Sequence, residues 1–249
     1  MKQLIKKMIP ARARQELRKL ESRFLGLERD YKHMSTEQVF DEIYTKGLWG
    51  KDDKGLPTSG SGSHTDAIVM PYVHAVKKVV DQYPMTTAVD LGCGDFAVGS
   101  RLYDQFDHYT ACDISSTILE RNRQRFDDRK LAFKKVNLAE GELPPADVAF
   151  VREVLQHLSN REIASFVDKL HTAKPYKYLV VTEHLPIAQD FAPNADKPSG
   201  PNVRVGLNSG IVLHEAPFSL RYKEKHDICS VEHSAGVSQG VVKTTLYVL

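Results

Sequence analysis

Short apolar runs alternate with amphipathic stretches along the chain. Runs with the length and composition of buried strands lie at residues 88–91, 109–112, 131–136, 147–151 and 176–182, and two longer ones close the chain at 218–232 and 241–249. Apolar residues at helical spacing predict helices over residues 64–82, 115–126 and 159–172. Strands that alternate with helices predict an α/β fold with a doubly wound, mostly parallel sheet.

The first strand runs into a glycine-rich turn, in the sequence Thr87-Ala-Val-Asp-Leu-Gly-Cys-Gly-Asp-Phe-Ala-Val-Gly99. Gly92 and Gly94 remove side chains where the backbone can approach a ligand, and they let the strand turn tightly into a helix. With Ala97 they match the loose G-x-G-x-x-G/A nucleotide fingerprint. The turn therefore predicts a nucleotide-type cofactor site at the carboxyl end of this strand.

Two carboxylates beside this turn narrow the choice of cofactor. Asp90 and Asp95 would repel the two phosphate charges of a dinucleotide, whereas they suit the ammonium and sulfonium groups of S-adenosylmethionine. Asp113 ends the next strand about twenty residues downstream, where a carboxylate can accept hydrogen bonds from ribose hydroxyls. This spacing suits either cofactor, so an NAD-dependent enzyme stays open as an alternative.

The motif Asp90-Leu-Gly-Cys-Gly-Asp95, followed by Cys112-Asp113, resembles the class I S-adenosylmethionine-dependent methyltransferases over residues 85–185. The resemblance implies a seven-stranded, Rossmann-like sheet that ends in a reversed hairpin. It also implies a set of cofactor contacts: Gly92 and Gly94 at the methionine end, Asp90 and Asp95 near its ammonium, Asp113 at the ribose, Asn137 near the adenine in place of the usual acidic residue, and Arg152 on the same rim.

The composition is that of a globular protein with one large core, since 41% of the residues are hydrophobic and 27% are charged. Cys93, Cys112 and Cys229 lie far apart without a C-x-x-C pair, which predicts a reducing compartment and neither disulfides nor a structural zinc site. The ten histidines show no metal-site spacing, so no metal is expected. Since no apolar stretch has the length of a signal peptide or a membrane span, we expect a cytoplasmic protein.

Charge and pattern divide the chain into three parts. Residues 1–33 contain ten Lys or Arg and four Asp or Glu. The remaining chain contains 24 Lys or Arg and 28 Asp or Glu. This first part predicts a basic amphipathic helix that lies against anionic lipid at the inner face of the membrane, against RNA, or with its apolar face on the catalytic domain. Residues 34–84 are predicted to form a lid and a leading helix, and residues 85–249 the S-adenosylmethionine-binding catalytic domain.

The lid prediction depends on aromatic and small residues ahead of the first strand. Tyr44 and Trp49, the only tryptophan, precede the run Ser59-Gly-Ser-Gly-Ser63. In enzymes of the resembled class, a substrate lid is common at this place. Tyr44, Trp49, Ser61 and Ser63 are therefore predicted to cover the cofactor or the acceptor, and a flexible tether is the alternative.

A second informative stretch, Arg152-Glu-Val-Leu-Gln-His157-Leu-Ser-Asn, follows the fourth strand. Ser159 and Glu162 form a capping-box pattern, so the next helix begins there and His157 lies in the loop before it. Because parallel strands place their carboxyl ends on one rim, His157 is expected near the cofactor turn. A neutral imidazole there can take a proton from an acceptor hydroxyl during methyl transfer, and a structural loop histidine is the alternative.

The same rim supplies the remaining candidates. Glu153 and His184 are reserve candidates for catalysis, whereas the candidates for acceptor contact are Gln156, Glu183, Asn194, Lys197 and Arg204. The last three come from a polar insertion at residues 185–210, a place where loops often set specificity, and a plain surface loop is the alternative.

The combination of Trp-Gly, Ser-Gly-Ser-Gly-Ser, Gln-His-Leu-Ser-Asn and Thr-Glu-His also resembles bacterial methyltransferases of surface-polysaccharide synthesis. This second resemblance implies a hydroxyl of a sugar or glycan as the acceptor. The alternatives are an RNA or lipid methyltransferase, a cofactor-binding module without catalysis, and an NAD-dependent enzyme. The net charge of −4 on residues 34–249 makes nucleic acid the less favoured partner. The oligomeric state is left open.

Overall fold

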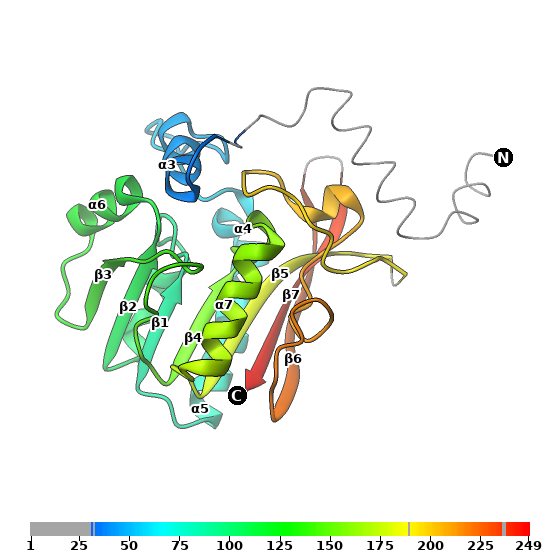
Figure 1. Ribbon diagram of the computed structural model, residues 1–249. Coiled ribbons are helices and arrows are strands. Elements are labelled where there is room, and N and C mark those ends of the chain that lie inside the picture. Colours follow the sequence, from blue (N-terminus) through cyan, green and yellow to red (C-terminus); the bar gives the residue numbers. More distant parts are fainter. Residues whose placement is uncertain (1–30, 32, 189, 236–237) are drawn as a thin grey trace.

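Seven strands form one sheet in the order β3-β2-β1-β4-β5-β7-β6 (Figure 1). The computed structural model describes residue 31 and residues 33–188, 190–235 and 238–249. The basic helix predicted over residues 1–33 falls almost wholly outside the described residues.

The boundaries of the first five strands follow the predicted apolar runs to within a few residues, whereas the sixth strand begins at Glu224 and not at residue 218. The strands are β1 Thr87–Leu91, β2 His108–Asp113, β3 Leu131–Lys135, β4 Val148–Arg152, β5 Tyr178–Pro186, β6 Glu224–Ala235 and β7 Ser238–Val248. The first five pair in parallel, whereas β7 is antiparallel to both β5 and β6. The predicted α/β fold is thus confirmed, with the closing hairpin making the sheet mixed.

Helices cover both faces of this sheet (Figure 1). They are α3 Thr36–Lys46, α4 Ser61–His64, α5 Asp66–Gln82, α6 Ser116–Arg125 and α7 Asn160–Thr172. The Ser159–Glu162 capping box is present at the start of α7, and Ser115 caps α6. The helix predicted from residue 64 begins instead at Asp66, after the single turn of α4.

The turn after β1 differs from the sequence expectation. Instead of a regular helix, two short 3₁₀ turns, η1 Gly99–Arg101 and η2 Tyr103–Gln105, lead to β2. A side chain at Gly99 would collide with the ring of Phe96, which is fully buried under the sheet. The Phe96 ring and the glycine thus hold this segment tightly against the core, where an extended α-helix does not form.

Alternating side chains divide the core into two layers. Val89 and Leu91 of β1 pack on the α7 side, while Ala88 packs on the α5 side. Each fully buried Val or Leu stabilises the fold by about 1.5–3 kcal/mol. Packing on both faces holds β1, β2 and β4 in register, so their carboxyl ends stand together at one edge.

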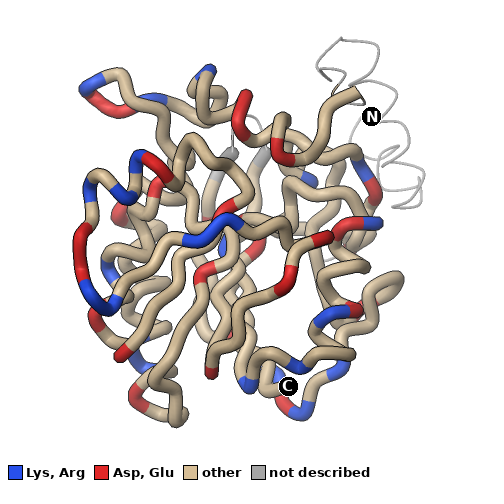
Figure 2. The backbone as a smooth tube through the Cα atoms, turned by 60° about the vertical axis from the view of Figure 1, so that its left-hand side comes forward, with Lys and Arg blue, Asp and Glu red and all other residues tan. Residues whose placement is uncertain are grey.

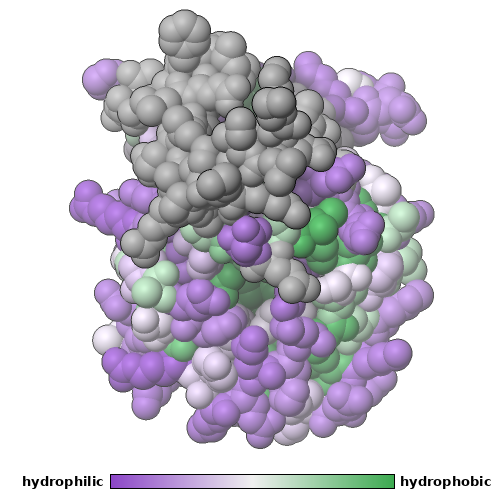
Figure 3. All heavy atoms as spheres, turned by 90° about the vertical axis from the view of Figure 1, so that its right-hand side faces the viewer, coloured by the Kyte–Doolittle hydropathy of each residue, from purple (hydrophilic) through white to green (hydrophobic). Residues whose placement is uncertain are grey.

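The surface is mixed in character. Lys and Arg are interspersed with Asp and Glu along the described backbone in Figure 2, mainly on loops and outer elements. Figure 3 shows a largely hydrophilic face with a hydrophobic band beside the grey atoms. In the described part of the chain, none of the helices combines the length and apolarity that crossing a bilayer requires.

Candidate active site

A cavity of about 590 Å³ opens along the carboxyl ends of the parallel strands. Its walls come from the turn after β1, the residues that follow β2, β3 and β4, the segment from α3 to α4, and residues 201–203. Ligand pockets in proteins commonly have volumes of roughly 300–1,000 Å³. The strand order reverses between β1 and β4, and this is where open α/β sheets bind their ligands.

The glycine turn is shaped by close packing. Gly92 has φ 87° and Gly94 has φ 54°, in the left-handed region that glycine adopts without strain. A Cβ on Gly92 would collide with Val154 from the loop after β4, and one on Gly94 would collide with Ser59. Other residues are therefore excluded at both positions because the two neighbouring segments rest directly on this turn.

Asp113 connects the glycine turn to the end of β2. Its Oδ2 accepts a hydrogen bond from the backbone N–H of Gly94 and its Oδ1 one from Ser115, each at 2.9 Å. Burial raises the pKa of Asp113 to about 6, so the carboxylate is ionised at neutral pH. Because it lines the cavity and a carboxylate can accept about four hydrogen bonds, it retains capacity for ribose hydroxyls.

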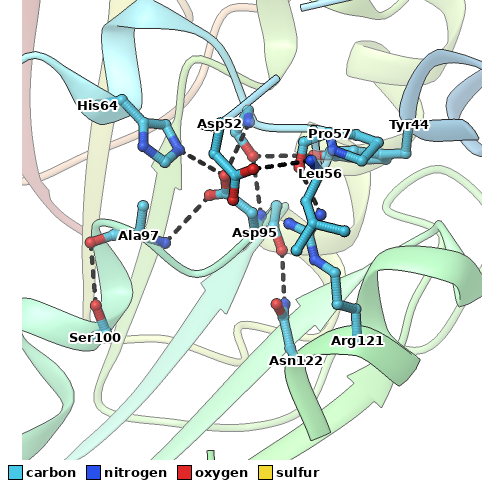
Figure 4. A network of polar contacts seen from close by, with 12 residues as sticks. Tyr44, Asp52, Leu56, Pro57, His64, Asp95, Ala97, Ser100, Arg121 and Asn122 are labelled. Carbon is cyan, nitrogen blue, oxygen red and sulfur yellow. Dashed lines mark hydrogen bonds and ion pairs between the residues drawn. The ribbon is translucent and has the colours of Figure 1, made fainter. Parts of the chain in front are cut away.

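Asp95 fastens the lid segment onto the glycine turn (Figure 4). Its Oδ2 accepts a hydrogen bond from the Ser59 N–H at 3.0 Å and lies 2.6 Å from His64 Nε2. In return, the Asp95 N–H donates to Ser59 Oγ at 2.9 Å. The hydrogen bond to Asp95 raises the pKa of His64. The carboxylate predicted to lie near a cofactor ammonium thus also holds the predicted lid segment in place. We call its contacts with Ser59 and His64 the clasp.

Asp90, Asp95 and Arg152 meet at a second, small cavity of about 30 Å³. Asp90 accepts a hydrogen bond from the Tyr109 hydroxyl at 3.2 Å, and burial raises its pKa to about 7. Arg152 pairs with Glu153 at 3.0 Å, yet its buried Nε has no partner among the described residues. The carboxylates of Asp90 and Asp95 and the Nε–H of Arg152 therefore line the same small cavity.

His157 lies in the short turn η3 Leu155–His157 and lines the large cavity. Its Nδ1 is 3.2 Å from the Gly200 carbonyl, which can only accept, so Nδ1 carries the proton of the neutral ring. The backbone of Asn202 is a second hydrogen-bond partner of this imidazole. Burial and the nearby positive charge of Lys197 lower the pKa of His157 to about 3. The imidazole is therefore neutral at physiological pH.

The predicted lid aromatics gather around this histidine. The Trp49 ring centroid lies 4.8 Å from that of His157 and 5.4 Å from that of Tyr44, and Trp49 Nε1 donates to the Pro201 carbonyl. Tyr44, Trp49, Ser61 and Ser63 all line the large cavity. The structure thus brings together segments that are about 150 residues apart in the chain.

Asn194, Lys197 and Arg204, predicted to contact the acceptor, do not line this cavity. Arg204 is fully buried, and its guanidinium donates to the carbonyls of Leu155 and Gln156 at 2.9 Å. The structure gives these residues a supporting role instead, because a buried guanidinium must direct all its donors to nearby acceptors. Asn194 bonds to Val212, and Lys197 donates to the backbone of His157.

The remaining candidates divide between the cavity and the core. Glu153, Gln156 and His184 line the cavity, as does Asn137, whose side chain also accepts from the Ala139 N–H. Glu183 does not line it. Because β5 extends to Pro186, Glu183 lies within the strand instead of after it, and burial raises its pKa to about 8.

Several wall residues were missed from the sequence. Ser59 had a signal, since it opens the small-residue run that forms the lid. His233 and Asn202 had none, because the first belongs to β6 and the second to an irregular loop. The ring of His233 stacks on that of His184 at 5.4 Å, and its carbonyl lies 3.2 Å from His184 Nε2.

The cysteines are free thiols, and one of them, Cys93, lies in the wall of the large cavity. Burial raises the pKa of Cys93 well above its usual value. No cluster of three or more His, Cys, Asp or Glu side chains able to hold a metal ion occurs among the described residues.

Residues 89–173 match the family described as a methyltransferase domain. The match covers about a third of the chain. It agrees with two sequence predictions, namely an enzyme that transfers methyl groups and S-adenosylmethionine as its cofactor. The matched residues run from β1 to the end of α7 and include the glycine turn, Asp113 and the His157 loop.

Solved structures share the fold beyond this domain. The N-methyltransferase NodS from Bradyrhizobium japonicum, crystallised with S-adenosylhomocysteine, is 11% identical with a TM-score of 0.54, covering 85% of this chain and 98% of that one. Human N-acetylserotonin methyltransferase in complex with S-adenosylmethionine is 15% identical to this chain with a TM-score of 0.50. The similarity covers 86% of this chain and 60% of that one.

A third similar structure is the methyltransferase domain of bacterial CtHen1-C, at 22% identity and a TM-score of 0.42, covering 46% of this chain. The chain spans 65% of the length of that structure. No curated relative matches the sequence.

The residues present fit S-adenosylmethionine. The two glycines leave backbone at the floor of the cavity, Asp113 offers free acceptor capacity for a ribose, and the orphaned Nε of Arg152 can donate to a carboxylate. Asp90 and Asp95, beside Arg152 in the small cavity, suit an ammonium group. When bound, this cofactor supplies a methyl group already activated on a sulfonium.

Proposed function

We propose that this protein transfers a methyl group from S-adenosylmethionine to a hydroxyl of a sugar or glycan, with His157 as the general base. The observation that carries the proposal is a neutral His157 in the wall of the cavity that also contains the glycine turn and Asp113. An acceptor hydroxyl placed against Nε2 can give up its proton there as its oxygen is methylated.

A low pKa does not disqualify His157 as the base. The proton on an oxygen that is gaining a methyl group becomes strongly acidic, so a weak base that is always unprotonated is sufficient. The Gly200 carbonyl orients the ring through Nδ1 and can stabilise the positive charge that develops. Alignment in the cavity contributes further, since well-oriented partners gain about 7–11 kcal/mol relative to free ones.

The acceptor half of the cavity supports a sugar. Trp49 offers an aromatic surface on which the C–H face of a sugar ring can pack, next to His157. Gln156, Asn202 and Ser61 offer amide and hydroxyl groups, which pair with neutral hydroxyls. The basic segment of residues 1–33, as a contact with a membrane that carries lipid-linked glycans, stays a prediction.

The test is transfer of a labelled methyl group to a defined panel. Methyl glycosides of glucose, galactose, mannose and rhamnose are compared with phospholipid vesicles and transfer RNA, each with the full chain and labelled S-adenosylmethionine. We expect label in at least one glycoside and its loss in His157→Gln. Label found only in RNA or only in phospholipid would overturn the sugar assignment.

A further inference from the structure

Gln156 carries a buried polar atom that no described residue satisfies. The residue is 3% exposed, and its Oε1 has no hydrogen-bond partner among the described groups. Its Nε2 donates to the Glu153 carbonyl at 3.3 Å, which determines which end of the amide is the oxygen. Because Gln156 lines the large cavity, a ligand there can donate to this oxygen.

The turn that holds Gln156 is fixed from two sides. Arg204 donates to the backbone carbonyls of Leu155 and Gln156 at 2.9 Å, and Glu183 Oε1 accepts from the Leu155 N–H at 3.1 Å. Both supporting side chains are buried. The turn therefore cannot swing outward to bring the carbonyl oxygen into bulk water, and the oxygen is preorganised for a donor within the cavity.

Gln156 directly precedes His157, and both side chains line the same cavity. Consecutive Cα atoms are about 3.8 Å apart, a distance within the span of one sugar ring. A sugar ring held against His157 therefore lies in the same cavity as the Gln156 side chain.

The surrounding charges favour a neutral donor. The Glu153 carboxylate, an acidic group in the cavity wall, is paired with Arg152 at 3.0 Å. This pairing leaves little net negative charge for an ammonium group, whereas a hydroxyl needs only the amide oxygen.

We propose that Gln156 is a specificity-determining residue whose Oε1 accepts a hydrogen bond from a second hydroxyl on the sugar ring being methylated. The enzyme then selects acceptors with two free hydroxyls on one ring, one facing His157 and the other facing Gln156. This inference rests on the proposed function, and it adds the requirement for the second hydroxyl.

The experiment pairs acceptor and protein changes. The methyl glycoside that is methylated best is compared with its monodeoxy derivatives, using the wild-type chain and Gln156→Met, which retains size but loses the amide oxygen. In the wild type, removing one particular non-reacting hydroxyl should lower kcat/KM by about 10- to 100-fold. For the intact glycoside, kcat/KM in Gln156→Met should be lower than in the wild type by a similar factor. Within Gln156→Met, removing the same hydroxyl from the glycoside should lower kcat/KM little further.

Matched controls separate this effect from damage to the fold. Gln124→Leu, on the exposed side of α6, should leave the ratio of kcat/KM between the glycoside and each deoxy derivative as it is in the wild type. Gln156→Met should bind S-adenosylhomocysteine by calorimetry as the wild type does. If deoxy derivatives lose equal factors in wild type and variant, Gln156 is not the specificity residue although sugar methylation stands. If no glycoside is methylated, the proposed function fails and the inference fails with it.

Discussion

The environment of His157 combines features that the sequence predicts with others that it does not. Its place in the loop before α7 follows from the Ser159–Glu162 capping box, and the structure has that box. The Gly200 carbonyl that sets its tautomer comes from an irregular loop far away in the sequence. The residues around His157 give no sequence pattern that predicts this contact. Arg204 shows the same limit, because a polar residue in a loop gives no sign that it will be buried under four backbone carbonyls.

The variant His157→Gln tests the base at the residue scale. We expect kcat to fall by about 10²- to 10⁴-fold, because an amide cannot take the proton at the reacting oxygen. Affinity for S-adenosylhomocysteine, measured by calorimetry, should remain unchanged. Since the folded-state pKa is about 3, the wild-type ring stays neutral as the pH falls from 8 to 5, and no loss of activity in that range should arise from this group.

His226→Gln, on the exposed part of β6, is the matched control and should turn over normally. Unchanged turnover in His157→Gln would remove this residue as the base and leave the cavity histidine with an orienting role only.

Among the elements, the strands were the most predictable and the turn after β1 the least. Apolar runs located β1 to β5 to within a few residues because buried strands need continuous apolar sequence. The glycine pattern predicts a helix after β1, but the packing of Phe96 under the sheet decides otherwise. The lid stays a prediction, and the hydrogen bond of Ser59 to Asp95 is a non-local pairing that the sequence does not indicate.

The clasp predicts a pH-dependent lid. His64 has a pKa raised by its bond to Asp95, so its stabilising contribution is fully present below the unfolded value of about 6.5 and is lost as the pH rises through the folded value. Hydrogen exchange of residues 59–64, corrected for the intrinsic rate, should therefore become faster between pH 6 and pH 9 relative to the core strands.

In His64→Gln the same segment should exchange faster than in the wild type at pH 6 and should show little further change with pH. Equal protection of the lid at both pH values in the wild type would show that Ser59 and the backbone hold it closed without the histidine.

For the whole molecule, the reversal of strand order at β1 and β4 decides where ligands bind. The resemblance to class I methyltransferases predicts a seven-stranded sheet with a reversed closing hairpin, and the described residues form both. The full outline of the cavity could not be predicted, since residues from β6 and from the loop before η4 Arg204–Leu207 contribute through long-range packing.

Cofactor choice can be measured on the intact protein. At 100 times its Kd, a ligand stabilises the native state by about 2.7 kcal/mol. For a chain of this size, each 1 kcal/mol raises Tm by about 2–4 °C. S-adenosylhomocysteine should therefore raise Tm by about 5–11 °C in thermal unfolding. NAD at the same concentration should have no effect, and the opposite result would contradict the electrostatic argument from Asp90 and Asp95.

The Cys93 thiol in the cavity wall bears on how the protein withstands its own methyl donor. Cys93 lies in a turn shaped to hold an alkylating reagent, and thiolates are the strongest nucleophiles among ordinary side chains. Burial keeps this sulfur protonated, because its pKa is raised well above the usual value. Because a protonated thiol is a weaker nucleophile than a thiolate, the raised pKa lowers the reactivity of Cys93 towards a methyl donor in the cavity.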